Sequence, residues 1–245
     1  ELLHLRRQVG SVVRVQSVLG LRLLLRRKRD LEGLSIMVTA GPTREALDPV
    51  RYISNFSSGK MGVALADEAA SQGAEVELVL GPCAVSPTNK NVNVTKVESA
   101  LEMYDACERI FPTSDVAIMA AAVADYRVEN PAEKKIKREH CDCPELHLVK
   151  NPDIAASLGK VKKSSQLLVG FALETDNEAE NALGKMARKG LDMIGLNSLK
   201  DSGAGFGTDT NKVTVFTAKG EEIAFGLKSK QEVARDIVNI IADKI

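Results

Sequence analysis

The feature that most constrains the fold is a short apolar strand followed by a long polar loop and a helix. Residues 34–38 are apolar except for Ser35, residues 39–59 form the loop, and residues 60–71 repeat apolar side chains with helical spacing. Residues 74–80 then alternate apolar and polar side chains, which predicts a second strand. Together these segments form a βαβ unit with a right-handed crossover and a parallel strand pair. The loop therefore leaves the carboxyl end of a strand, where α/β proteins bind their ligands.

The end of this loop has the residues of an anion-binding site. N–H groups at the start of a helix are aligned with the helix dipole and attract anions. Gly59 and Gly62 allow close approach to the backbone, Ser57 offers a cap for the helix, and Lys60 adds positive charge. A capped helix without a ligand would use similar residues. The loop is much longer than the usual 2–6 residues, however, which favours a functional role.

Two well-known phosphate-binding loops do not fit this segment. A Walker A loop needs a glycine where Ser54 stands, and a serine or threonine where Met61 follows Lys60. A dinucleotide fingerprint needs closely spaced glycines directly after the strand, whereas no glycine follows Gly41 until Gly59. Neither a P-loop nucleotidase nor a nicotinamide-binding protein is indicated.

The rest of the chain predicts a Rossmann-like three-layer α/β fold with a mostly parallel central sheet and a small β-hairpin extension. Residues 116–122 are continuously apolar, as expected for a central strand buried on both faces. The other predicted elements are strands at residues 92–97, 146–149, 167–173 and 192–197, helices at residues 99–111, 178–188 and 231–245, a helix that starts at residues 151–153, and a hairpin at residues 213–225.

Small residues followed by an acid end the predicted central strand. Ala121 and Ala122 leave room for a ligand, and Asp125 follows them. At the carboxyl end of a parallel strand this pattern predicts the floor of a pocket. The alternative is a tight packing point between strand and helix, with Asp125 as a helix cap.

A basic segment, residues 129–144, comes next and includes Lys134 and Lys135. Beside a phosphate loop, it predicts a lid that neutralises the charge of a triphosphate. By itself, it would be an ordinary solvated loop. Cys141 and Cys143 lie in the same segment, but their Cys-x-Cys spacing lacks the usual gap of a zinc site. We therefore expect surface cysteines and assign no metal ligands.

Composition sets limits on the partners and the compartment. The formal net charge is zero and no apolar run approaches 18 residues, so we expect a cytoplasmic protein with no nucleic-acid or membrane partner. Residues 1–33 are strongly basic and begin with Glu1. We interpret them as a linker or the remnant of an upstream domain, with residues 34–245 as the main domain. A transit or membrane-surface helix is the alternative for the basic segment.

Eight motifs between residue 34 and the C-terminus occur in the order found in one known family. They are VTAGPTRE, DPVRYISN, SSGKMG, AAAVADYR, KIKR, KNPDI, GFALET and DTNKV. Through them the chain resembles the phosphopantothenate–cysteine ligases, or phosphopantothenoylcysteine synthetases, of coenzyme A biosynthesis. In bacteria this domain usually follows a flavin-dependent decarboxylase, so the resemblance implies a fused or associated decarboxylase that alone would bind FMN.

The resemblance also implies the reaction. The carboxylate of 4′-phosphopantothenate attacks the α-phosphate of CTP to give an acyl-cytidylate and pyrophosphate, and the amine of cysteine then displaces CMP. Mg²⁺ accompanies the triphosphate, with no protein ligands assigned to it. ATP stays open as the alternative nucleotide.

Site residues follow from the same resemblance. Asn55 matches the asparagine that holds the acyl-cytidylate, and Lys135 matches the lid lysine that neutralises charge. Arg51 matches an arginine that reaches phosphopantothenate across a homodimer interface. Further substrate contacts are implied for Asn55, Ala121, Ala122 and Asp125. Nucleotide contacts are implied for Gly41, Ser57, Gly59, Gly62, Met119, Ala120, Ala121, Asp125, Lys135, Pro152, Asp153, Ile154, Ala155, Phe171, Lys185, Lys189 and Asn197.

Two other functions were weighed against this one. A short-chain-dehydrogenase-like nicotinamide oxidoreductase needs Tyr-x-x-x-Lys, and none of the three tyrosines has a lysine four positions later. A silent nucleotide-binding subunit is disfavoured because Asn55 and Lys135 are both present. The chain departs from many bacterial members at Phe56, where they carry a polar residue, and at Arg138, where they often carry a second lysine.

Overall fold

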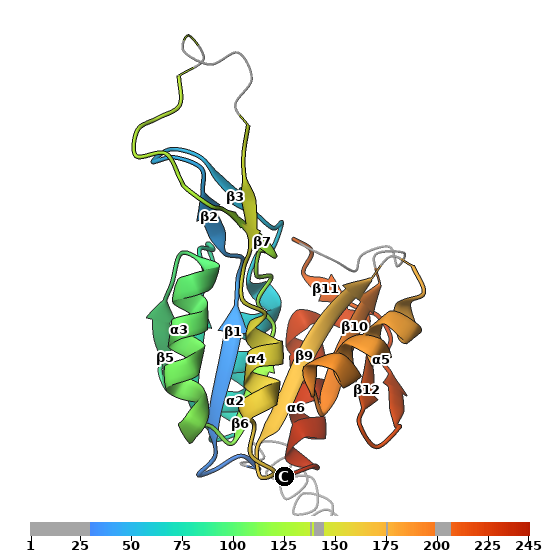
Figure 1. Ribbon diagram of the computed structural model, residues 1–245. Coiled ribbons are helices and arrows are strands. Elements are labelled where there is room, and N and C mark those ends of the chain that lie inside the picture. Colours follow the sequence, from blue (N-terminus) through green and yellow to red (C-terminus); the bar gives the residue numbers. More distant parts are fainter. Residues whose placement is uncertain (1–29, 138, 140–144, 175, 199–206) are drawn as a thin grey trace, which may run out of the picture.

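The computed structural model describes residues 30–137, 139, 145–174, 176–198 and 207–245. Its centre is an eight-stranded sheet with helices on both faces (Figure 1). The strand order is β13 (Glu222–Ala224), β12 (Val213–Thr217), β10 (Met193–Ser198), β9 (Leu167–Glu174), β6 (Val116–Met119), β1 (Ser35–Ala40), β4 (Glu75–Leu80) and β5 (Val92–Lys96). The six strands from β10 to β5 are parallel, and β12 and β13 add an antiparallel hairpin. The predicted fold class is confirmed.

Strand β1 lies where the order of the parallel strands reverses. The chain moves from β1 outward to β4 and β5, and then returns to place β6 on the other side of β1. In the register, Thr39 pairs with Val79 of β4 and with Met119 of β6. The carboxyl ends of β1 and β6 therefore diverge into loops at a topological switch point, which is the usual ligand site of an open α/β sheet.

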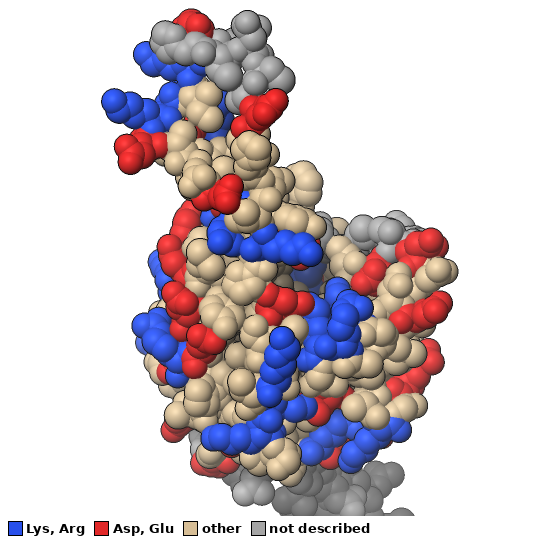
Figure 2. Space-filling view, viewed as in Figure 1, with Lys and Arg blue, Asp and Glu red and all other residues tan. Residues whose placement is uncertain are grey.

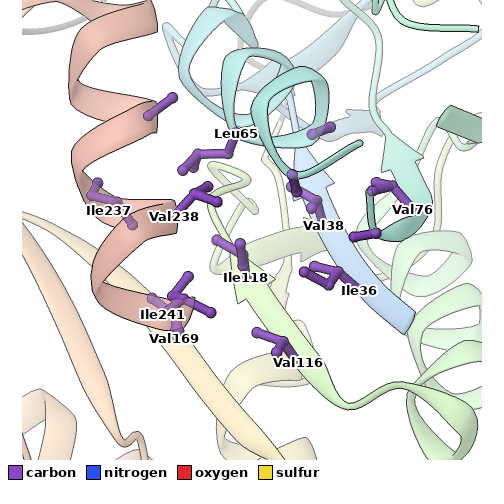
Figure 3. Packing of buried hydrophobic residues seen from close by; sticks show 14 of the residues in the cluster. Ile36, Val38, Leu65, Val76, Val116, Ile118, Val169, Ile237, Val238 and Ile241 are labelled. Atoms are coloured by element: carbon purple, nitrogen blue, oxygen red, sulfur yellow. The ribbon is translucent and has the colours of Figure 1, made fainter. Parts of the chain in front are cut away.

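Two layers of helices bury the sheet. Helices α2 (Lys60–Ser71) and α6 (Lys230–Ala242) cover one face, and α3 (Ala100–Ile110), α4 (Ile154–Val161) and α5 (Glu178–Lys189) cover the other (Figure 1). Figure 3 shows the first layer, in which side chains of both helices meet those of the strands. The labelled residues are Leu65 of α2, Ile237, Val238 and Ile241 of α6, and Ile36, Val38, Val76, Val116, Ile118 and Val169 of the sheet.

An arm projects beyond the carboxyl edge of the sheet (Figure 1). It consists of the hairpin of β2 (Arg44–Ala46) and β3 (Tyr52–Ser54), the paired strands β7 (Tyr126–Val128) and β8 (Leu148–Lys150), and the described residues between β7 and β8. Figure 2 shows both basic and acidic side chains on this arm and interspersed over the same face of the body.

Predicted and observed elements differ at two points that matter for the site. The central strand was predicted over residues 116–122, but β6 ends at Met119. Beyond it the backbone bends so that the N–H groups of Ala121 and Ala122 donate to Thr39 Oγ1 at 3.2 Å and to Gly41 O at 2.9 Å. The last apolar residues therefore leave the ladder and form a floor at the strand ends.

The start of α2 also differs from the prediction. Gly59, rather than Ser57, is the N-cap residue, and no side chain caps this helix. Gly59 has φ of 76°, and a Cβ there would lie 2.7 Å from Cys83 Sγ. The position therefore requires glycine for conformation and for space.

Several sequence predictions lie outside the described residues or at their margin. Residues 1–29, Arg138, Cys141 and Cys143 lie outside them. Leu31 is fully buried in the core, and its N–H donates to Gln72 O at 3.3 Å. No helix among the described residues is long and apolar enough to span a membrane.

Candidate active site

A cleft of about 500 Å³ opens at the carboxyl ends of β1, β6, β9 and β10. It brings together side chains from segments that are far apart in the sequence. The sequence-predicted site residues that line it are Asn55, Met119, Ala120, Ala121, Ala122, Asp125, Pro152, Asp153, Ile154, Ala155, Phe171, Lys185, Lys189 and Asn197.

The predicted glycines of the phosphate loop lie beside the cleft rather than in its lining. A Cβ on Gly62 would lie 2.5 Å from Ala40 Cβ, and one on Gly41 would lie 3.0 Å from Gly81 O. These two glycines let α2 and the loop pack closely against β1 and its neighbour. Together with Ser57 and Gly59 they are absent from the residues that line the cleft, so their nucleotide contacts stay predictions.

The floor of the cleft, residues 120–125, is held by three polar side chains of the preceding segment. Thr39 Oγ1 accepts from Ala121 N–H, and Thr43 Oγ1 accepts from Ala124 N–H at 3.0 Å. Asn55 Nδ2 donates to the carbonyl groups of residues 122 and 123, at 3.0 and 3.1 Å. Asn55 therefore joins the long loop directly to the floor.

Asn151 closes one wall of the cleft and was not predicted as a site residue. Its side chain donates to Ala124 O at 2.8 Å, and its N–H donates to Asp125 O at 2.9 Å. Arg127 Nη1 donates to Asn151 Oδ1 at 3.2 Å and orients the amide. Asn151 belongs to the KNPDI motif, and the four residues that follow it were predicted to contact the nucleotide. No role was predicted for the asparagine itself.

Two lysines one helical turn apart on α5 line the same cleft. Lys189 Nζ lies 2.9 Å from the carboxylate of Asp153, which is the N-cap of α4, and Lys185 Nζ lies 3.6 Å from Glu174 Oε1. Burial alone would raise the pKa of Asp153, but the hydrogen bond from Lys189 and that from the Ala156 N–H hold this pKa below its ordinary value. The cleft thus has two cations that a ligand phosphate could attract from their carboxylate partners.

The base of the arm is anchored by one buried carboxylate, that of Asp48. It accepts from the N–H groups of Val50 and Arg51 at 2.8 and 2.9 Å, from Ile136 N–H at 3.1 Å, and from the Arg51 guanidinium at 2.5 Å. The hydrogen bond with Arg51 is the main cause that holds the pKa of Asp48 far below its ordinary value. Arg51 Nη2 also donates to Ile136 O at 2.9 Å, so Arg51 joins two segments of the arm within one chain.

Lys135 precedes Ile136, is exposed, and is absent from the residues that line the cleft. Both predicted arm residues, Arg51 and Lys135, are therefore absent from the lining of the cleft, and Arg51 contacts the backbone of the residue after Lys135. Their predicted contacts with substrates stay predictions.

The lining of the cleft also contains two buried polar residues that were not predicted. Asn211 is 2% exposed, and Lys230 is 5% exposed. Burial and the charge of Lys60 lower the pKa of Lys230. The DTNKV motif contains Asn211, but the sequence did not predict that this side chain lines the same cleft as Asn197 of β10.

A larger depression of about 870 Å³ lies between α2, α6 and residues 85–91. Its lining mixes basic residues such as Lys90 and Arg235 with acidic ones such as Asp67 and Glu68. Lys60, which the sequence placed at the anion-binding helix start, lines this depression and not the cleft. None of the residues with an implied substrate or nucleotide contact lies there, and it is not at the strand ends. Among the described residues, no group of three or more His, Cys, Asp and Glu side chains could hold a metal ion.

The sequence pattern of one protein family matches nearly the whole chain. Residues 31–245 match the family described as DNA/pantothenate metabolism flavoprotein C-terminal domain. The chain belongs to this family. Its membership confirms the resemblance on which the sequence-based assignment was built.

Two similar proteins are longer than this chain, which belongs to the DNA/pantothenate metabolism flavoprotein C-terminal domain family. The chain is 53% identical over 214 residues to a cysteine/cysteine sulfinic acid decarboxylase from an unknown prokaryotic organism, covering 87% of this chain and 59% of that protein. It is 47% identical over 218 residues to the coenzyme A biosynthesis bifunctional protein CoaBC of Haemophilus influenzae, covering 89% of this chain and 54% of that protein. The chain thus spans somewhat over half the length of these relatives.

A solved structure has the same fold over nearly its full length. The crystal structure of the C-terminal domain of a coenzyme A biosynthesis bifunctional protein CoaBC matches with a TM-score of 0.75 and 40% identity, covering 88% of this chain and 97% of that one. The central sheet and its helices therefore belong to a known domain architecture.

Proposed function

We propose that this chain is a phosphopantothenate–cysteine ligase domain of coenzyme A biosynthesis. The observation that carries the proposal is the cleft itself. It joins Asn55, the floor at residues 120–125 and the two lysines of α5, which come from separate motifs, at the switch point of the sheet. Family membership and the CoaBC relatives support the same activity.

The proposed first step activates a carboxylate. A carboxylate oxygen of 4′-phosphopantothenate attacks the α-phosphorus of CTP, the bond from that phosphorus to the bridging oxygen breaks, and pyrophosphate leaves with the electron pair. Negative charge grows on the leaving group, so cations at the cleft lower the barrier. Lys185 and Lys189 line the cleft, and Lys135 would approach from the arm.

The proposed second step forms the amide. The cysteine amine attacks the acyl carbon, the bond to the cytidylate oxygen breaks, and CMP leaves while the nitrogen loses a proton. Asn55, fixed by its Nδ2 to the floor, has its Oδ1 available to position the acyl-cytidylate. Catalysis in this scheme rests on positioning and electrostatics.

Magnesium would accompany the nucleotide and neutralise part of the triphosphate charge. Protein sites for this ion commonly supply one or two carboxylates and leave the other positions to phosphates and water. Two carboxylates line the cleft in the described part of the chain, and Asp153 is paired with Lys189. Asp125 is therefore the carboxylate that would face the ion. FMN would belong only to an attached or associated decarboxylase.

The working form in this proposal is a homodimer, with Arg51 facing the neighbour's substrate. The arm exposes large apolar side chains, which normally mark a protein interface. Val50, Tyr52, Tyr126 and Leu148 are about half exposed, and Phe56, which lines the cleft, is 92% exposed. We expect the dimer to act in the cytoplasm on small molecules.

One assay tests the proposed activity. The purified chain is incubated with 4′-phosphopantothenate, cysteine and either CTP or ATP, and pyrophosphate release is measured. We expect release with CTP and a strong decrease after Lys135→Ala, while Asn93→Ala, an exposed change on the edge strand β5, leaves the rate unchanged. No release with either nucleotide would refute the ligase assignment. Release with ATP alone would show that the substrate nucleotide is ATP and not CTP.

A nicotinamide oxidoreductase was the alternative. The family match favours the ligase. The sequence after β1 also lacks a dinucleotide fingerprint, and Asn55 of the long loop holds the floor of the cleft instead.

A further inference from the structure

Two asparagine side chains that line the cleft have a buried oxygen without a hydrogen-bond partner in the described part of the chain. They are Asn197 Oδ1 and Asn211 Oδ1. Buried polar atoms in folded proteins are nearly always hydrogen-bonded, because an unpaired one costs the free energy of its lost hydration. Two such atoms in the lining of one cleft indicate a ligand that supplies the missing partners.

The sheet register and the chain order bring both amides to the same cleft. Asn197 of β10 pairs with Val213 of β12. Asn211 precedes Val213 by only two residues, and both asparagine side chains line the cleft. The family resemblance implies a nucleotide contact for Asn197, but it implies no role for Asn211.

The segment that carries Asn211 is held on both sides. Lys60 Nζ donates to Gly207 O at 3.2 Å and to Asp209 Oδ1 at 2.7 Å, and the Lys230 N–H donates to Asp209 O at 2.9 Å. Lys230 Nζ also donates to the carbonyl groups of residues 208 and 210. The β11 (Thr210–Asn211) strand pairs with β14 (Lys228–Ser229). The backbone at Asn211 is therefore fixed.

The amide of Asn211 is oriented as well. Its Nδ2 donates to Met61 Sδ at 3.8 Å, which leaves Oδ1 as the group without a partner. An amide oxygen only accepts hydrogen bonds. A hydrogen-bond partner for this oxygen is therefore an O–H or N–H group, and an ionised phosphate oxygen does not qualify.

We propose that Asn211 binds the nucleotide in this cleft by accepting a hydrogen bond from a ribose hydroxyl or from the exocyclic amine of the base. This inference rests on the proposed function, because that function supplies the nucleotide. Asn211 is then a specificity residue in the lining of the cleft, and Lys60 and Lys230 position the segment that presents it.

Calorimetric titration of the purified chain and of Asn211→Ala tests the proposal. The titrants are CTP, 2′-deoxy-CTP, 3′-deoxy-CTP and UTP, with 4′-phosphopantothenate as a second ligand. We expect Asn211→Ala to weaken CTP binding roughly tenfold, the effect of losing one hydrogen bond in a dry site. The analogue that lacks the contacted donor should bind the parent chain more weakly and should not respond to the substitution. Binding of 4′-phosphopantothenate should not change.

A stability measurement separates recognition from a structural role. Because Asn211 Oδ1 has no partner in the described chain, Asn211→Ala should not lower the melting temperature of the ligand-free protein. Asn93→Ala, with its exposed side chain on the far edge of the sheet, serves as the control for both measurements.

The outcomes are distinct. Unchanged CTP affinity in Asn211→Ala overturns the assignment of Asn211 and leaves the proposed function standing. An equal loss for CTP and all three analogues also overturns it, because the substitution then acts through the shape of the cleft. If the parent chain binds no nucleotide, the proposed function fails at its first step and the Asn211 assignment fails with it.

Discussion

Asn55 and Lys189 illustrate how single side chains combine structural and ligand-binding roles in this cleft. The Nδ2 group of Asn55 joins the loop to the floor, and its Oδ1 makes no hydrogen bond among the described residues. Lys189 holds the N-cap carboxylate of α4 in an ion pair. Substitution of either residue therefore changes the shape of the cleft as well as its chemistry, and the tests need readouts that separate the two.

Asn55→Ala should separate the two half-reactions. We expect pyrophosphate to be released while the acyl-cytidylate accumulates, because the amide is assigned to holding and breaking down the intermediate. The overall rate should fall by about 10²- to 10³-fold, as when one positioned hydrogen-bonding group is removed from other active sites. Rapid quench and separation of the nucleotide products measure both steps. If pyrophosphate release is lost instead, Asn55 serves the first step.

Lys189→Met should show a pH-dependent effect on stability. The pKa of Asp153 is lowered in the folded state, so the pair stabilises the fold fully above the unfolded pKa of about 3.9 and loses this effect as pH falls through the folded pKa. Because Asp153 is about half exposed, we expect a loss of under about 1 kcal/mol at pH 7 and almost none at pH 2. Urea unfolding at both pH values measures it, with exposed Lys96→Met as control. A loss that is equal at both pH values would contradict the ion-pair explanation.

The arm is an element whose geometry depends on one internal carboxylate. Asp48 joins the turn before β3 to the backbone at Ile136. Glu45 of β2 accepts from the Ala100 N–H at the start of α3 at 3.0 Å. The arm is therefore tied both to itself and to the body. Lys135 is adjacent to this anchor in the sequence, so the anchor determines where that lysine is presented.

Asp48→Asn should loosen the arm while it preserves side-chain volume. The neutral amide places N–H groups toward the Arg51 guanidinium and the Ile136 N–H, so both contacts with Oδ2 become unfavourable. We expect at least tenfold faster proteolysis within the arm and a slower release of pyrophosphate. Asp67→Asn is the matched control, since Asp67 also accepts several backbone hydrogen bonds but lies away from the arm. Equal proteolysis of Asp48→Asn and the parent chain would argue against the anchor.

At the scale of the whole molecule, one sheet with two helical layers determines where the cleft lies. The six parallel strands end at the same edge, and the reversal of order at β1 leaves space between the loops that follow β1 and β6. Helices α2 and α6 fix this arrangement from one side, with Leu65, Ile237 and Ile241 fully or almost fully buried. The residues of this layer therefore keep the site in place although they do not line the cleft.

Leu65→Ala should be strongly destabilising. Leu65 is fully buried between α2, α6 and the sheet, so truncation leaves a cavity and costs about 2–5 kcal/mol of unfolding free energy. Leu101→Ala, on the exposed side of α3, should change stability by less than about 1 kcal/mol. Urea-induced unfolding followed by circular dichroism compares the two. Similar losses of unfolding free energy for both variants would contradict the burial of Leu65 between the helices and the sheet.

The sequence by itself determined most strands of the central sheet, the helices that cover it and much of the lining of the cleft. The periodicities that predicted β1, α2, β9 and the hairpin of β12 and β13 depend on neighbouring residues, which a linear pattern contains. The ordered motifs marked Asn55, the floor and the lysines of α5 through the resemblance to the ligase family.

Only the tertiary structure decided which distant residues share a surface. It ended β6 at Met119 because Thr39 and Gly41 bind the residues that follow, and it required glycine at position 59 because Cys83 packs there. It also brought Asn211 to the end of β10. These outcomes depend on strand order and close packing between remote segments, and such contacts leave no local periodicity in the sequence from which they could be predicted.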